Sequence, residues 1–183
     1  MKVFLDFEAS SLSDHSWPVE VAWVFQDGRS ESHLIAPLPQ WSDWDEESER
    51  IHGLSRELLR EQGQSAQDVG TRMIEALDGH DLFASAPSWD GKWLSALLRG
   101  AGLDRHALRL RNTSEALEET AREELKHLLT GPHLEDETHR VVMTAGARPE
   151  TPPAHRALPD AVAERERWLA VKAAARKRVA EGK

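Results

Sequence analysis

The stretch Met1-Lys-Val-Phe-Leu-Asp-Phe-Glu-Ala-Ser-Ser-Leu12 decides the fold. Residues 3–5 form an apolar run typical of a buried strand, and Asp6 and Glu8 interrupt it with Phe7 between them. Because successive side chains of a strand point to opposite faces, Asp6 and Glu8 share one face. Two carboxylates side by side at the end of a core strand are unfavourable unless a positive charge lies between them, and a divalent metal ion is the obvious candidate. The alternative is a strand that runs out into solvent with two exposed acids.

The rest of the chain predicts a mixed sheet flanked by helices. Apolar and β-branched runs bounded by turn residues predict four more strands, and the Asp-Gly pair at residues 27–28 is typical of a tight hairpin turn. Helical spacing of apolar residues predicts the helices. The further strands are expected over residues 19–25, 30–36, 81–86 and 106–111, and the helices over 56–61, 65–79, 93–102, 112–129 and about 160–181.

Residues 131–153 are predicted to be irregular, because they contain several glycines and prolines. A segment of this length without secondary structure in a compact domain is usually functional or mobile.

The composition is that of a soluble protein, and we expect one domain over residues 1–183. Apolar residues make up 39% of the chain and charged residues 30%, which is ordinary for a soluble fold. The chain has no cysteine, so any metal site must use Asp, Glu, His or carbonyl ligands, a set that suits Mg²⁺ or Mn²⁺. No stretch approaches the length of a membrane span, and we expect a cytoplasmic protein.

The net charge of −9 is unevenly distributed, since residues 161–183 carry seven Lys or Arg against three Glu. Acidic proteins can bind nucleic acids where a local basic patch and bound metal ions supply the attraction. The charge balance therefore neither supports nor excludes a nucleic-acid partner. The basic terminal helix is either a contact for the phosphate backbone or an ordinary solvated helix.

Two later segments supply more side chains of the kind that bind metals or move protons. Asp90 lies where the fourth strand passes into an amphipathic helix, and His155 and Asp160 lie at the start of the last helix. Each has an ordinary explanation: Asp90 as a helix N-cap, Asp160 as an acid in the field of the helix dipole and His155 as an exposed imidazole. Together these explanations require several independent coincidences, which favours a shared site with the two acids of the first strand.

These motifs resemble those of the DEDDh group of 3′–5′ exonucleases on the ribonuclease H-like fold, which includes ribonuclease T, oligoribonuclease and polymerase proofreading subunits. Its strand motif Asp-x-Glu is matched by Leu5-Asp-Phe-Glu8, and its helix motif by Trp89-Asp-Gly-Lys-Trp-Leu94. Its most specific motif, His-x-Ala-x-x-Asp-Ala, is matched throughout by His155-Arg-Ala-Leu-Pro-Asp-Ala161. Residues 51–55 resemble a turn common in this group, whereas the usual His-Asn pair before the second motif is Ser85-Ala86 here. The resemblance spans residues 2 to about 163.

The resemblance implies an α/β, ribonuclease H-like fold with a mixed five-stranded sheet and a metal-dependent 3′–5′ exonuclease. Two Mg²⁺ or Mn²⁺ ions, roughly 3.5–4 Å apart, would lie across the scissile phosphate, and a histidine would take the proton from the attacking water. The partners would be single-stranded RNA or DNA 3′ ends, from which nucleoside monophosphates are released, and a homodimer is left open. The implied metal ligands are Asp6, Glu8, Asp90 and Asp160, and the implied general base is His155 on a flexible loop.

Substrate contacts are expected next to the first strand. The backbone and hydroxyl groups that follow Glu8 could hold the terminal nucleotide, with Leu12 wedged against its base as in similar exonucleases. Imidazoles and aromatic rings stack on unpaired bases, which makes His52 and Trp89 candidates, although core packing explains Trp89 equally well. The candidate contacts are Ala9, Ser10, Ser11, Leu12, His52 and Trp89.

The choice between RNA and DNA depends on contacts to the 2′-hydroxyl, so both substrates stay open. A catalytically weak nucleic-acid-binding or partner-recruiting module on the same fold is the main rival, and it would be marked by the loss of a ligand position. Every position of the ligand set is filled here. An endonuclease of the same broad fold is disfavoured by the His-x-Ala-x-x-Asp spacing.

Overall fold

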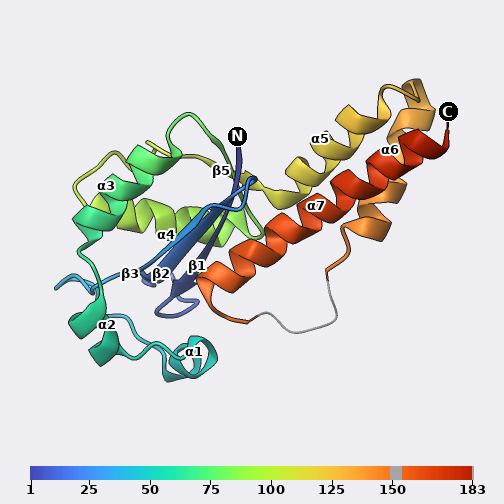
Figure 1. Cartoon of the computed structure of the whole chain (residues 1–183). Helices are drawn as coiled ribbons and strands as arrows, with labels where there is room; N and C mark the ends of the chain where they lie inside the picture. The colour runs from blue at the N-terminus through green and yellow to red at the C-terminus, as the bar shows by residue number, and fades with distance from the viewer. Residues whose placement is uncertain (149–153, 183) are drawn as a thin grey trace.

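The computed structural model describes residues 1–148 and 154–182, and its centre is one mixed sheet of five strands in the order β3-β2-β1-β4-β5 (Figure 1). Strand β1 pairs antiparallel with β2 and parallel with β4, so the acid-bearing first strand is the middle of the sheet. The strands are β1 (Lys2–Ala9), β2 (Pro18–Phe25), β3 (Ser30–Leu34), β4 (Asp81–Ala84) and β5 (Leu110–Asn112). The predicted mixed five-stranded sheet flanked by helices is confirmed.

Helices cover both faces of this sheet (Figure 1). Helices α3 and α4 pack on one face and α5 and α7 on the other, while α6 packs against α5 and α7. Across the described ranges, no helix is both long and apolar enough to cross a membrane. The helices are α1 (Glu46–His52), α2 (Arg56–Gln62), α3 (Ala66–Leu77), α4 (Pro87–Gly100), α5 (Thr113–Leu125), α6 (Gly131–Ala145) and α7 (Ala157–Glu181).

The side chains of β1 alternate between two separate cores. Leu5 and Phe7 belong to the core under α3 and α4, whereas Phe4 lies in the core under α5 and α7, with its ring centroid 5.8 Å from that of Trp168. Because Asp6 and Glu8 follow Phe4 at even spacing, they lie on the α7 face of the sheet. The last helix therefore covers the face that carries both acids.

A third apolar cluster fixes the end of the sheet at which β1 finishes. Trp17 and Val19 are fully buried there against Leu54 and Leu59, which come from the region of α1 and α2. The Trp17 ring stacks on that of Trp41 with centroids 5.4 Å apart. These contacts hold α1 and α2 beside the end of β1.

Two sequence predictions need correction. Residues 131–145 form helix α6, so the predicted irregular segment 131–153 is wrong over most of its length, and residues 149–153 lie outside the described residues. Pro132 is compatible with a helix because it lies in the first turn, where a backbone N–H has no helical partner. The strand predicted over 106–111 is shorter and later, at Leu110–Asn112.

The seating of α7 on the sheet can be tested through Trp168, whose indole N–H donates to the Thr120 hydroxyl at 2.7 Å in the buried core. Thr120→Val keeps the volume but leaves a buried donor without an acceptor, so we expect the free energy of unfolding to fall by about 1–3 kcal/mol in urea titrations. The double variant Thr120→Val/Trp168→Phe should lose less than the sum of the two single variants. The contact would be contradicted if the losses of the two single variants added up in the double variant, or if Thr120→Val were as stable as the parent protein.

Candidate active site

Three carboxylates from the two ends of the chain meet on the α7 face of the sheet. One oxygen of each of Asp6, Glu8 and Asp160 lies within 4.8 Å of the others. β1 supplies the first two, and the first turn of α7 supplies the third. Glu8 and Asp6 are half-buried, so the alternative of two acids exposed at a strand end does not describe this geometry.

Crowding and burial make the ionised forms of these acids unfavourable. Burial, followed by the charges of Asp160 and Glu20, raises the pKa of Glu8 to about 8. Burial and the charges of Asp90 and Glu8 likewise raise the pKa of Asp6 well above its ordinary value. A bound cation would reverse this repulsion, and carboxylate oxygens are the ligands that hard divalent cations prefer.

Asp90, in the first turn of α4, is more buried than these three acids, with only 3% of the residue exposed. It is not the N-cap of that helix, because Ala86 occupies the cap position; instead its carboxylate accepts the Ala86 N–H at 3.2 Å. Burial raises the pKa of Asp90 to about 7, against the opposing effect of backbone hydrogen bonds. Asp90 is outside the group of three close carboxylates but near enough for its charge to raise the pKa of Asp6.

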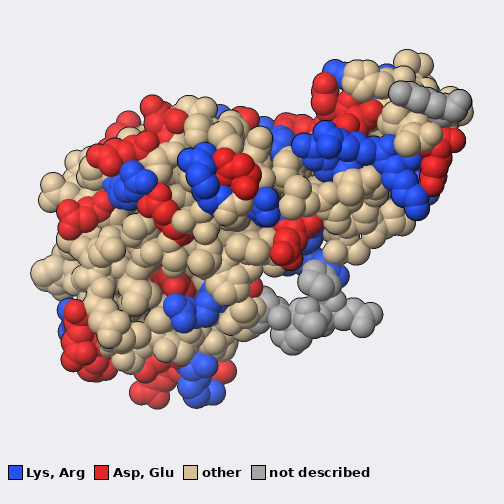
Figure 2. Space-filling model, in the orientation of Figure 1, with Lys and Arg blue, Asp and Glu red and all other residues tan. Residues whose placement is uncertain are grey.

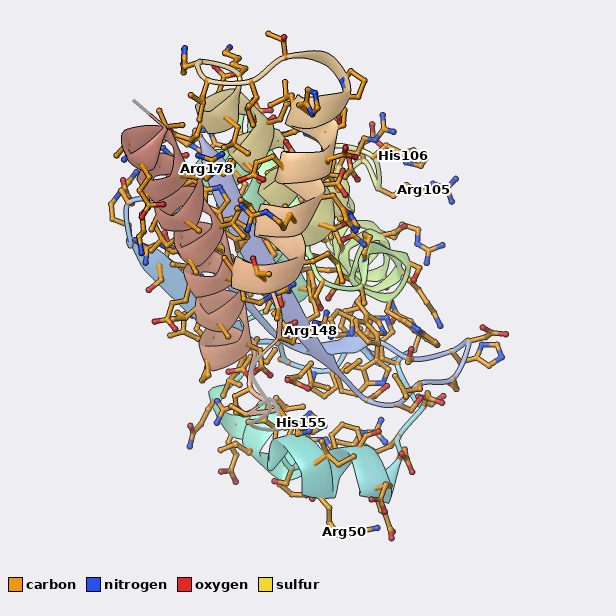
Figure 3. All side chains as sticks on the ribbon, turned by 90° about the vertical axis from the view of Figure 1, so that its right-hand side faces the viewer. Arg50, Arg105, His106, Arg148, His155 and Arg178 are labelled. Carbon is orange, nitrogen blue, oxygen red and sulfur yellow. The ribbon has the colours of Figure 1, made fainter. Side chains whose placement is uncertain are left out.

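His155 lies immediately before α7 with its side chain exposed (Figure 3). Figure 3 places it between the start of α7 and α1. Its φ of 52° is left-handed, which is uncommon for a residue other than glycine and occurs preferentially at functional sites. The preceding residue is held by Asp160, whose Oδ1 accepts the Ala154 N–H at 3.0 Å.

Glu164 is an additional acid that sequence reasoning missed. It lies one helical turn after Asp160, is 8% exposed, and its charge raises the pKa of both Asp6 and Asp90. Both of its oxygens accept from the Arg167 guanidinium at 2.8 Å. The i, i+4 spacing from Asp160 was the available signal, because residues at this spacing share a helix face.

The loop after β1 is built around Asp43. Its carboxylate accepts hydrogen bonds from the hydroxyls of Ser10 at 3.0 Å, Ser11 at 2.6 Å and Ser13 at 2.7 Å. Ser10 and Ser11 are buried next to buried Ala9, whereas Leu12 is 70% exposed. The two serine hydroxyls that we considered as substrate contacts are thus bonded to Asp43, and the exposed apolar side chain of this loop is Leu12.

The remaining two candidate contacts differ in accessibility. His52 is 4% exposed, its Nδ1 accepts the Leu54 N–H at 3.0 Å, and burial lowers its pKa, so it is a neutral, enclosed ring. Trp89 is half-buried against Trp93, with the Lys92 ammonium 4.8 Å from its ring centroid. Trp89 is therefore partly accessible to solvent, whereas His52 is almost fully enclosed.

The basic end of α7 lies away from this site. Lys172 is twelve residues beyond Asp160, which corresponds to about 18 Å along a helix. Figure 2 shows Lys and Arg side chains gathered over this outer part of α7. Two of them are paired with acids of neighbouring helices, Arg176 with Glu124 and Arg178 with Glu137, each at 2.9 Å.

Comparison with known proteins identifies the fold. No family model and no curated protein sequence matches the chain. Solved structures do match, among them the zinc-bound complex of Escherichia coli exonuclease I with single-stranded DNA, at a TM-score of 0.59 and 16% identity over 90% of this chain. Exonuclease I from Methylocaldum szegediense matches at a TM-score of 0.60 and 15% identity over 92% of this chain. The ribonuclease H-like fold is thereby confirmed. The chain spans only 38% and 40% of the lengths of these two proteins.

The raised pKa values predict that the metal-free protein loses stability as pH rises from about 5 to 8. In this window folded Glu8 and Asp90, with pKa values of about 8 and 7, keep protons that the unfolded chain has already released. Above pH 5 the two groups together cover about five units of raised pKa, and each unit corresponds to about 1.4 kcal/mol, so we expect a loss of up to about 7 kcal/mol. Thermal unfolding in a chelator at several pH values measures it. Glu8→Gln should flatten the dependence, and a stability that rises toward pH 8 would contradict the prediction.

The Asp43 cluster predicts an ordered loop. Asp43→Ala leaves three serine hydroxyls without their acceptor, so we expect a loss of about 1–3 kcal/mol in unfolding free energy. Amides of residues 10–17 should also exchange hydrogen faster in mass-spectrometric measurements. Ser42→Ala, at the exposed neighbouring position, serves as the matched control. Equal exchange in both variants would show that Asp43 does not organise the loop.

Proposed function

We propose that this protein is a metal-dependent 3′–5′ exonuclease that acts on single-stranded nucleic-acid ends and releases nucleoside monophosphates. The observation that carries the proposal is the meeting of Asp6, Glu8 and Asp160 within 4.8 Å from segments more than 150 residues apart. The fold shared with exonuclease I, which is described in complexes with single-stranded DNA, supports the same reaction class. We propose that residues 1–183 act as one exonuclease domain.

The donor set fits hard divalent cations. Asp6, Glu8, Asp90 and Asp160 would hold two Mg²⁺ or Mn²⁺ ions, because all four offer carboxylate oxygens. Burial, with neighbouring negative charges, raises the pKa of Asp6, Glu8 and Asp90, and a bound cation would favour their ionised forms. When bound, such ions activate a water molecule and stabilise the charge on the departing 3′ oxygen. Asp90 is enclosed and held by a backbone N–H, so it would act as the most rigid of the four ligands.

His155 is proposed as the general base. An imidazole suits this role because its ordinary pKa of about 6.5 lies close to neutral pH. The side chain is exposed, and His155 follows directly after Ala154, whose backbone N–H is bonded to the proposed ligand Asp160. In this role His155 accepts the proton that the attacking water loses.

The residues around β1 would hold the 3′ nucleotide. Leu12 is suited to wedge against the terminal base because it is exposed on a loop that Asp43 fixes. Trp89, which is half-buried, would stack on a base if the Lys92 ammonium moved away from its ring. His52, which is enclosed, would contribute by supporting the end of β1 at Ala9 rather than by stacking.

The activity is tested with 5′-labelled single-stranded RNA and DNA oligonucleotides in the presence of Mg²⁺ or Mn²⁺. We expect progressive shortening from the 3′ end, and we expect Asp6→Ala and His155→Ala to reduce kcat by about 100-fold or more. Glu123→Ala, which truncates an exposed acid on α5, should behave as the parent protein does. No shortening of either substrate, or full activity in Asp6→Ala, would favour the rival of a catalytically weak binding module.

A further inference from the structure

A buried carboxylate outside the close cluster connects β2 to the start of α7. Glu20 lies in the otherwise apolar strand β2, directly opposite Glu8 in the antiparallel register, and its side chain is 3% exposed. A carboxylate buried to this extent is costly unless it is paired and hydrogen-bonded. The groups that donate hydrogen bonds to the Glu20 carboxylate therefore indicate its structural role.

Those contacts come mainly from the residues that follow His155. The Arg156 guanidinium donates to both oxygens of Glu20, at 2.9 Å from Nε and 2.8 Å from Nη2, and the Ala157 N–H donates to Oε2 at 3.0 Å. Burial opposes ionisation of Glu20, but the hydrogen bonds from Arg156 and Ala157 keep its pKa below the ordinary value. Glu20 and Arg156 thus form a bidentate ion pair. Through the Ala157 N–H, Glu20 also caps the first turn of α7.

His155 lies between two such anchors. On its N-terminal side the Ala154 N–H bonds to Asp160, and on its C-terminal side Arg156 and Ala157 bond to Glu20. The left-handed backbone of His155 is unfavourable for a residue with a side chain, and such conformations persist only where the surrounding structure fixes them. The fork to Glu20 is the firmest of these restraints because it is bidentate and its acceptor is buried.

We propose that Glu20 and Arg156 are positioning residues for the exonuclease site, and we call this pair the latch. The latch holds the strained backbone of His155 and the first turn of α7, so that the imidazole and the Asp160 carboxylate face the acids of β1. This proposal rests on the proposed function. It assigns Arg156, which is 44% exposed, to Glu20 rather than to a substrate phosphate.

Kinetics of Glu20→Gln and Arg156→Lys test the latch, since each keeps size or charge but breaks the fork. We expect kcat to fall about 10- to 100-fold with KM changed by less than about threefold, because misplacement of a catalytic group by about 1 Å has effects of this size. The double variant should lose no more than the worse single variant, as expected of residues that act as a unit. A rise in KM with unchanged kcat in Arg156→Lys would overturn the proposal and assign Arg156 to the substrate.

Hydrogen exchange separates the latch from the proposed activity. In the metal-free protein, the backbone amides of residues 154–158 and 160 should exchange at least about tenfold faster in both variants, which corresponds to about 1.4 kcal/mol of lost protection. Arg72→Lys, in the similar fork between Arg72 and Glu31 on α3 and β3, is the matched control and should change neither kcat nor this exchange. If the parent protein lacks nuclease activity but both variants exchange these amides faster than the parent does, the latch is supported and the proposed function is rejected. Parental exchange and kcat in both variants would reject the latch alone.

Discussion

The repulsion among carboxylates on one face of β1 is the constraint on which the rest of the structure depends. Asp6 and Glu8 occupy the end of the central strand, where burial already penalises their charges. The fold adds to this penalty, because α7 brings Asp160 and Glu164 to the same face. Acids are kept together at such a cost where a cation or a reaction uses them, and functional sites are commonly the least stable part of a fold.

Much of this arrangement could be predicted from local sequence patterns. The alternation of β1 placed Asp6 and Glu8 on one face, and the sheet class followed from the order of strands and helices. The last helix was expected from about residue 160, and the structure begins it at Ala157. These predictions of the fold succeeded because the spacing of apolar residues and the residue preferences of turns are local properties of the sequence. The roles assigned to individual residues stay predictions.

What could not be predicted depends on contacts between distant segments. Glu20 is a single acid in an apolar strand, and only the docking of α7 on the sheet reveals that Arg156 satisfies it. Helix α6 was missed because the glycines and prolines of residues 131–153 predict an irregular segment, although the apolar face from Leu134 to Ala145 is stable once α5 and α7 cover it. The hydrogen bonds from the Ser10 and Ser11 hydroxyls to Asp43 likewise could not be predicted, because Asp43 lies more than thirty residues further along the chain.

The late position of α7 in the chain has a consequence for the timing of folding. All five strands and Asp6, Glu8 and Asp90 precede residue 113, so a growing chain can complete its sheet before the last helix exists. Domains fold progressively from the N-terminus during synthesis, and the core that Trp168 completes stays open until α7 docks. The nascent protein would thus hold three of the four proposed ligands without the helix that supplies the fourth and presents the base. The proposed site would therefore be complete only once α7 has docked on the sheet.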